Sequence, residues 1–351
     1  EVGHARDYRA ALRAAAVVAD QDARRAAITA ALDQAAAALG GAWRDPGGKM
    51  EEVVHLVERP SVIAGRIADA HMALPARVLV TAMQSHQRYF PVEHADGSLA
   101  PAFLAVSNGD PAHAELITRG NEDVLDARLQ DAGFSYDRDR EAGLDALDAR
   151  LDAIVFHQRL GTLAQKRDRL VAGVGELAAA VGAPPDVALH AEGAARLAKV
   201  DQGAVLVAEF SVLEGFAAAH YARLGDVPEP VCRAIEEQYM PEAADSPLPA
   251  TGAGALLAAA DRIDNLVGAF LVDEAPSGSK DPYGLRRAAT GLVRIALERR
   301  WDAPIRPLLA SAAARLRDQG ADLALEDDAA LDALEAFIAD RLAFLLAAEG
   351  V

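Results

Sequence analysis

A glycine-containing loop that runs into basic residues is the densest chemical signal in the chain. Residues 278–287 read Gly-Ser-Lys-Asp-Pro-Tyr-Gly-Leu-Arg-Arg. Asp281 suits the N-cap of a helix and Pro282 its first residue, so we expect a helix to begin there. A helix start beside Lys280 and the following arginines suits phosphate binding, because backbone N–H groups and cations both attract anions.

Two stretches are locally basic although the whole chain is acidic. The formal net charge of −18 argues against broad electrostatic binding of a polyanion, because each phosphate contact needs a Lys or an Arg. Residues 157–169 and 280–300 reverse this sign. We expect a local nucleic-acid surface made by their basic side chains: Arg159, Lys166, Arg167, Lys280, Arg286, Arg287 and Arg294. The alternative is that both stretches are ordinary solvated helix faces.

A set of polar side chains lies in the first third of the chain. Residues 85–92 read Ser-His-Gln-Arg-Tyr-Phe-Pro-Val, so several side-chain donors precede a predicted strand. This density suits recognition of a polar ligand, and the candidates are His86, Gln87, Arg88 and, after a later strand, Asn108. Alternatively, the polar side chains face solvent while the aromatic ones enter the core, and the Asn-Gly-Asp sequence is only a turn.

Two separated segments in the second half each carry an aspartate. Asp201 follows Val200, and Asp261 lies sixty residues later. This layout resembles that of the HD-type metal phosphohydrolases, which hold a divalent ion with an early His, a His-Asp pair and a late Asp. Val200 stands where the His of the pair belongs.

The early histidine of that layout is displaced as well. Gln158 occupies the position that fits the pattern best, and His157 precedes it. Two carboxylates without imidazoles make a poor transition-metal site, so we expect a degenerate site with no metal and a structural role for both aspartates. A metal-dependent phosphohydrolase using Asp201, Asp261 and His157 is the rival hypothesis.

The elements that must position these residues are mostly helical. Aromatic residues make up only 5% of the chain, and apolar residues recur at helical spacing over 7–39 and after about 121. Residues 50–110 contain short β-branched or aromatic runs, with an Asp-Gly hairpin signal at 96–97. We therefore predict a predominantly helical α+β chain with three parts: a mixed α/β module (1–140), an all-α domain (141–300) and the start of a further helical domain (301–351).

Several classes of protein lose support. The chain lacks the GxxxxGK[ST], GxGxxG, CxxC, HExxH and GxSxG motifs. Cys232 is the single cysteine, so no internal disulfide forms, and no apolar run has the length of a membrane span. The first 25 residues are charged throughout and contain no signal peptide, so we expect a cytoplasmic protein.

Several motifs, in this order, resemble the β subunit of bacterial glycyl-tRNA synthetase over essentially the whole chain. They lie at residues 74–83, 86–92, 106–110, 120–129, 134–136, 160–163, 209–215, 259–264 and 278–287. The chain departs from the family pattern at 202–204, 242–244 and Gly284, and these departures leave the order of the motifs intact.

The resemblance implies a division of labour. An α subunit would make glycyl-adenylate with ATP and Mg²⁺, so we expect neither cofactors nor catalytic residues in this chain. The β subunit would bind tRNA(Gly) within an α2β2 assembly. The chain would be an internal fragment that holds the end of an editing-type module (1–140), a degenerate HD-like domain (141–300) and the start of an anticodon-binding part (301–351). A purely structural helical scaffold is the third hypothesis.

Overall fold

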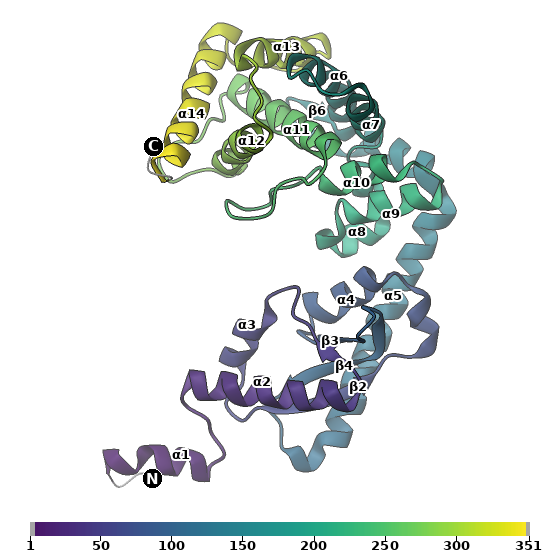
Figure 1. Ribbon diagram of the computed structural model, residues 1–351, viewed down its shortest axis with the longest axis vertical. Coiled ribbons are helices and arrows are strands. Elements are labelled where there is room, and N and C mark those ends of the chain that lie inside the picture. The colour runs from purple at the N-terminus through teal and green to yellow at the C-terminus, as the bar shows by residue number, and fades with distance from the viewer. Residues whose placement is uncertain (1–3, 349–351) are drawn as a thin grey trace. The chain divides into compact units, whose positions relative to one another are not determined.

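The chain divides into two compact units, Glu1–Arg138 and Asp139–Val351. The computed structural model describes residues 4–348, so the outer ends of the predicted first and third parts, 1–3 and 349–351, lie outside the described residues. Helices dominate both units, and a small antiparallel sheet lies in the first (Figure 1). The predicted class, a predominantly helical α+β chain, is confirmed. The assignment of separate roles to residues 1–140, 141–300 and 301–351 stays a prediction.

The first unit combines helices with a four-stranded sheet. In chain order its elements are the 3-10 helix η1 (Ala5–Asp7), α1 (Tyr8–Ala14), α2 (Gln21–Ala38), β1 (Ala42–Trp43), α3 (Lys49–Leu56), β2 (Ser61–Arg66), η2 (Asp69–Ala73), α4 (Ala76–Ser85), β3 (Phe90–Glu93), β4 (Leu99–Ser107), η3 (Pro111–His113) and α5 (Ala114–Ala149), which continues into the second unit.

The sheet of the first unit has the strand order β1-β3-β4-β2, and every neighbouring pair is antiparallel. The hairpin predicted at 96–97 is confirmed, because β3 pairs with β4 and Gly97 adopts φ +83° in the turn between them. Helix α2 packs on this sheet through Ile28 and Leu32, which share a buried core with Phe90 and Leu104. This core positions the polar residues that precede β3 and follow β4.

The second unit is a helical bundle with one small sheet. Its elements are η4 (Arg150–Ala153), β5 (Val155–His157), β6 (Gly161–Thr162), α6 (Leu163–Ala180), α7 (Pro185–Arg196), η5 (Val200–Gly203), α8 (Val205–Glu209), η6 (Ser211–Leu213), α9 (Phe216–Leu224), α10 (Glu229–Glu237), α11 (Gly252–Leu271), α12 (Leu285–Arg299), α13 (Ile305–Asp318) and α14 (Asp327–Ala348). The prediction that this region is entirely helical missed the pair β5–β6, whose turn depends on Gly161 at φ +93°.

Helix α11 lies at the centre of the second unit (Figure 1). Nearly all of its side chains are buried, because it is surrounded by α6, α7, α10, α12, α13 and α14. Leu309 of α13 and Leu334 of α14 are buried in the same apolar core, so the segment after residue 301 packs onto the bundle. Among residues 4–348, no helix combines the length and the apolarity that crossing a bilayer requires.

Candidate functional site

Charged residues interrupt the apolar sequence of α11 near its middle. Asp261, Arg262 and Asp264 each have no more than 7% of their surface exposed. A buried charge is costly unless it is paired and hydrogen-bonded, so the helices around α11 have to supply partners. These partners come from α6, from the turn before η5 and from the segment that follows α10.

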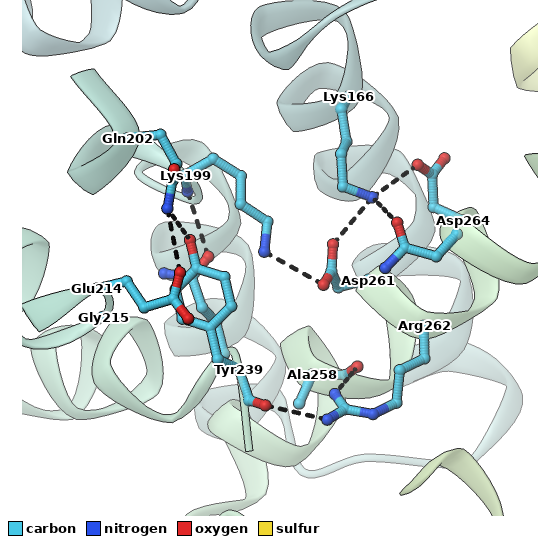
Figure 2. Close-up of polar contacts among 12 residues, drawn as sticks. Lys166, Lys199, Gln202, Glu214, Gly215, Tyr239, Ala258, Asp261, Arg262 and Asp264 are labelled. Atoms are coloured by element: carbon cyan, nitrogen blue, oxygen red, sulfur yellow. Dashed lines mark hydrogen bonds and ion pairs between the residues drawn. The ribbon is translucent and has the colours of Figure 1, made fainter. Parts of the chain in front are cut away.

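Lys166 of α6 supplies the first cation. Its Nζ lies 2.9 Å from Asp261 Oδ1 and 2.9 Å from Asp264 Oδ2, and it donates a 2.7 Å hydrogen bond to Asn265 Oδ1. The lysine side chain is 2% exposed, and it points toward Asp261 and Asp264 of α11 (Figure 2). Burial alone would raise the pKa of Asp264, but Lys166 and Arg169 outweigh it and hold that pKa below its ordinary value.

Lys199, which directly precedes η5, supplies the second cation. Its Nζ lies 3.2 Å from Asp261 Oδ2 and 4.0 Å from the centre of the Tyr239 ring. The two lysines therefore reach different oxygens of one carboxylate, from opposite sides (Figure 2). Burial opposes ionisation of Asp261, yet the two ammonium groups hold its pKa far below the ordinary range.

Asp201 belongs to a neighbouring hydrogen-bonded group. Its carboxylate accepts the backbone N–H of Gly215 at 2.7 Å and the Tyr239 hydroxyl at 3.1 Å. Burial raises the pKa of Asp201, and burial together with Asp201 raises the pKa of Glu214. Both oxygens of Asp201 thus have protein partners, and the structure places this aspartate beside Tyr239 and Lys199 rather than against Asp261.

The remaining positions of the predicted metal layout do not converge on these carboxylates. Val200 is wholly buried and apolar. Gln158 is exposed in the turn between β5 and β6, and the His157 ring lies 3.1 Å from Glu274 Oε2. Among residues 4–348, no three His, Cys, Asp or Glu side chains gather in a way that could hold a metal ion. The donor set does not fit a divalent ion, since ammonium groups take the cation positions beside Asp261.

A polar pocket of about 400 Å³ opens next to the buried ion pairs. It lies between the segments that follow η6 and α10, the middle of α11 and the start of α12. Its polar lining residues are Glu214, Tyr239, Glu242, Asp261, Arg262, Asn265, Tyr283 and Arg287. Tyr239 was not singled out in the sequence, and Glu214 lies within the motif at 209–215 but received no role there.

Arg262 lines the same pocket and organises its rim. One terminal nitrogen donates to Ala258 O at 2.8 Å, and the other donates to Tyr239 O at 3.1 Å and to Pro241 O at 3.0 Å. The guanidinium therefore fixes the chain that leaves α10. Its hydrogen bonds to carbonyl groups give this side chain a structural role.

Helix α12 begins at Leu285, so the predicted start at Pro282 was wrong. Asp281 does cap the helix, because its carboxylate accepts the N–H groups of Leu285 at 2.8 Å and Arg286 at 3.0 Å. The cap acts across a turn that ends at Gly284, whose φ is +64°. Since Asp281 already satisfies these N–H groups, the helix start is occupied by a carboxylate of the chain itself.

Most of the predicted basic candidates have partners within the protein. Lys166 is buried, so it contributes nothing to a surface that meets RNA. Arg159 pairs with Asp322 at 3.1 Å, and Arg167 pairs with Asp148 and Asp168. These three side chains bind elements of the second unit together.

The arginines of α12 divide into two kinds. Arg286 donates to Gly278 O at 2.7 Å, and Arg294 donates to Ser246 O at 3.1 Å and to Ala243 O at 3.4 Å. Both therefore hold loops. Arg287 is exposed at the polar pocket, and Lys280 is exposed in the preceding loop. Lys280 and Arg287 are the predicted cations that the fold leaves at the surface.

The polar candidates of the first unit have separate partners. Arg88 adopts φ +57° and donates to Glu52 Oε1 at 2.6 Å, which ties it to α3. Asn108 accepts the N–H groups of Glu58 at 2.9 Å and Arg59 at 2.8 Å. His86 is exposed and Gln87 half-buried. Arg88 and Asn108 thus stabilise two different loops, and their role in recognition stays a prediction.

Comparison with known proteins identifies the family of the chain. A family profile described as "Glycyl-tRNA synthetase beta subunit" matches residues 1–351. The "Glycine--tRNA ligase beta subunit" of Desulfitobacterium hafniense is 37% identical over 345 residues, which are 98% of this chain and 50% of that protein. The proteins of the same name from Bacillus subtilis and Rhodospirillum centenum are 40% and 38% identical, over 86% and 98% of this chain and 44% and 48% of their own lengths.

The chain spans about half the length of the curated relatives that it matches. The profile match covers the whole chain, and the identities exceed the level at which a common fold and family are secure. These findings establish that the chain belongs to the glycyl-tRNA synthetase β-subunit family.

Proposed function

We propose that this chain is the part of a glycine–tRNA ligase β subunit that binds tRNA(Gly), while a separate α subunit activates glycine with ATP and Mg²⁺. Family membership carries the proposal. The two central aspartates also support it, because the carboxylates of Asp261 and Asp201 already bind lysine side chains and a backbone N–H group of the protein. In this proposal the chain itself makes no adenylate and works in the cytoplasm within an α2β2 assembly.

We further propose that the RNA-contacting surface of the second unit is centred on Lys280 and Arg287. Both side chains are exposed. Arg287 lines the polar pocket, and Lys280 lies in the loop that precedes α12. Arg287 also lies close enough to Arg262 for the two guanidinium charges to repel each other. An exposed cation with no carboxylate partner among residues 4–348 is better placed to meet a phosphate than Arg159 or Arg167, which would have to exchange an existing ion pair.

The net charge of the chain makes such a localised surface necessary. At −18, this chain repels a polyanion at long range. Binding therefore has to come from short-range contacts of a few cations, and contacts elsewhere in the assembly would set the identity of the tRNA. The acidic surface also disfavours non-specific binding to other nucleic acids.

Reversal of both charges tests this proposal in the complete β subunit assembled with the α subunit. Lys280→Glu with Arg287→Glu should raise the KM for tRNA(Gly) about tenfold in glycylation. Glycine-dependent exchange between ATP and pyrophosphate should stay unchanged, because that step needs no tRNA. Arg233→Glu is the matched control, since Arg233 is exposed on α10. An unchanged KM in an assembled, folded double variant would remove these two residues from the RNA surface.

The phosphohydrolase hypothesis predicts a different result. It requires Asp201 and Asp261 to hold a divalent ion that activates water. Glu274 lies against the His157 ring, and the two aspartates already have ammonium, amide and hydroxyl partners. Stoichiometric metal with turnover of a nucleotide in the purified β subunit would favour that hypothesis over RNA binding alone.

A further inference from the structure

The cluster on α11 has the layout of a cation site whose cation is supplied by the protein. Asp261 and Asp264 lie one turn apart on α11, and Lys166 Nζ lies 2.9 Å from an oxygen of each. Lys199 Nζ lies 3.2 Å from the other carboxylate oxygen of Asp261, Oδ2. Carboxylate and amide oxygens at this spacing are the ligands that a hard divalent ion prefers, and Asn265 Oδ1 is a third oxygen at the same ammonium group.

The two ammonium groups match a divalent ion in total charge. Each lysine supplies one amino group, and the two reach opposite oxygens of the same carboxylate. Burial lowers the pKa of Lys199, and Asp261 opposes this shift. The lysine side chains are 2% and 5% exposed, so neither moves aside into solvent without opening the bundle. An incoming cation would meet two like charges at the positions that it needs, and repulsion at such distances in a buried site is strong.

Ring contacts hold both ammonium groups in place. Lys166 Nζ lies 4.5 Å from the centre of the Phe156 ring, and Lys199 Nζ lies 4.0 Å from that of Tyr239. An aromatic face stabilises a desolvated cation. Each ammonium group thus has a carboxylate on one side and a ring nearby, which is how a protein stabilises a permanent internal charge.

We propose that Lys166 and Lys199 form a built-in cation pair that replaces a divalent ion between α6, the turn before η5 and α11, and that excludes divalent cations from the polar pocket. The pair joins segments that are 98 and 62 residues apart in the sequence, between Lys166 and Asp264 and between Lys199 and Asp261. Bridging of this kind is what a structural metal ion does in small domains. Here the link needs no metal supply.

Removal of both ammonium groups should expose the underlying oxygen site. In the variant Lys166→Met with Lys199→Met, the oxygens of Asp261 and Asn265 lose their ammonium partners, whereas Asp264 keeps its ion pair with Arg169. The methionine side chains keep much of the volume of the lysines. Titration with Mn²⁺, followed by the electron paramagnetic resonance of the free ion, should reveal one bound ion per chain. The midpoint of thermal unfolding of this variant should fall well below that of the unaltered chain and rise again on addition of Mn²⁺.

The unaltered chain should bind no Mn²⁺ in the pocket up to about 1 mM, the weak end of oxygen-ligand sites in proteins. Lys280→Met is the matched control for loss of a lysine, and it should behave like the unaltered chain because Lys280 is exposed in a loop. The proposal fails if the unaltered chain binds one Mn²⁺ that Asp261→Asn abolishes. It also fails if the double variant keeps the original unfolding midpoint and gains no Mn²⁺ binding.

If the double lysine variant does not fold, the proposal is tested by comparing two other variants. Lys199→Met alone leaves one oxygen of Asp261 without its ammonium partner, whereas Lys199→Met with Asp261→Asn removes both charges. The second variant should have the higher unfolding midpoint if the lysine acts as a counter-ion. An equal or lower midpoint in the charge-cancelled variant would overturn the proposal.

Discussion

Arg169 and Asp264 form a two-pronged ion pair inside the helical bundle. The guanidinium Nε and one terminal nitrogen of Arg169 lie 2.6 and 3.0 Å from the two carboxylate oxygens, and both side chains are at most 3% exposed. The other terminal nitrogen donates to Gln319 Oε1 at 2.8 Å. One arginine of α6 therefore connects α11 with the residue that follows α13.

Truncation of this pair should be strongly destabilising. Arg169→Met leaves Asp264 buried with only Lys166 as its cation and removes the bond to Gln319. Removal of one partner of a buried pair typically costs about 3–5 kcal/mol, because the remaining charge is uncompensated. Urea denaturation of the variant and of the unaltered chain measures the difference. A loss below about 1 kcal/mol would mean that this pair is no more important than a surface salt bridge.

The paired aspartates should make the stability of the helical unit depend on pH and decline in acid. The folded-state pKa values of Asp261 and Asp264 lie below their ordinary value, so the unfolded chain takes up protons first as the pH falls. The stabilisation is therefore fully present above the unfolded pKa of about 4 and is lost as the pH falls through the lower folded values. Unfolding free energy measured from pH 6 down to about pH 2 should decline. The decline should be shallower in Asp261→Asn, and an equal decline would contradict the assignment.

Arg294 should act as a loop tether and not as an RNA contact. Its guanidinium donates to Ser246 O and Ala243 O, so Arg294→Ala leaves two carbonyl groups without these donors. We expect a loss of about 1–3 kcal/mol in unfolding free energy and faster amide hydrogen exchange over residues 243–249. The affinity of the assembled β subunit for tRNA(Gly) should stay within about twofold of its unaltered value, because the Arg294 side chain holds a loop and does not contact the RNA. A large loss of affinity with unchanged exchange would restore Arg294 to the RNA surface.

Gly203 should tolerate no side chain. A Cβ atom at this position would lie 2.3 Å from Leu147 O, which is a backbone atom that cannot rotate away. Gly203→Ala should cost about 1–3 kcal/mol, as overpacking typically does. Gly120→Ala is the control, because nothing lies within 4 Å of the place that its added methyl group would take in α5, and it should be neutral or slightly stabilising. Thermal unfolding of the two variants compares them, and equal midpoints would contradict the packing at Gly203.

Local signals made much of the fold predictable from the sequence. The Asp-Gly pair at 96–97 predicted the hairpin between β3 and β4, because the turn geometry depends only on adjacent residues. Helical spacing predicted the bundle for the same reason. The start of α12 was misplaced because Asp281 caps from before a Pro-Tyr-Gly turn, which a sequence pattern reads as the first turn of the helix.

The candidate site was less predictable because its contacts are long-range. Lys166 lies in a basic stretch that reads as a solvated face, yet its partner Asp264 is 98 residues away. Nothing near Lys166 in the sequence signals that α11 will bury it. The sequence singled out Asp261 only as a position of a degenerate metal layout, and its cationic partners appear only when the helices are packed.

The central claim, that the chain binds RNA through a few local cations, is tested most directly by the salt dependence of tRNA(Gly) binding. The logarithm of the association constant of the complete β subunit should be plotted against the logarithm of salt concentration, with and without the Lys280→Glu and Arg287→Glu substitutions. We predict weaker binding and a slope reduced by about two, one for each lost phosphate contact. Equal affinity and an equal slope in the folded variant would contradict the account.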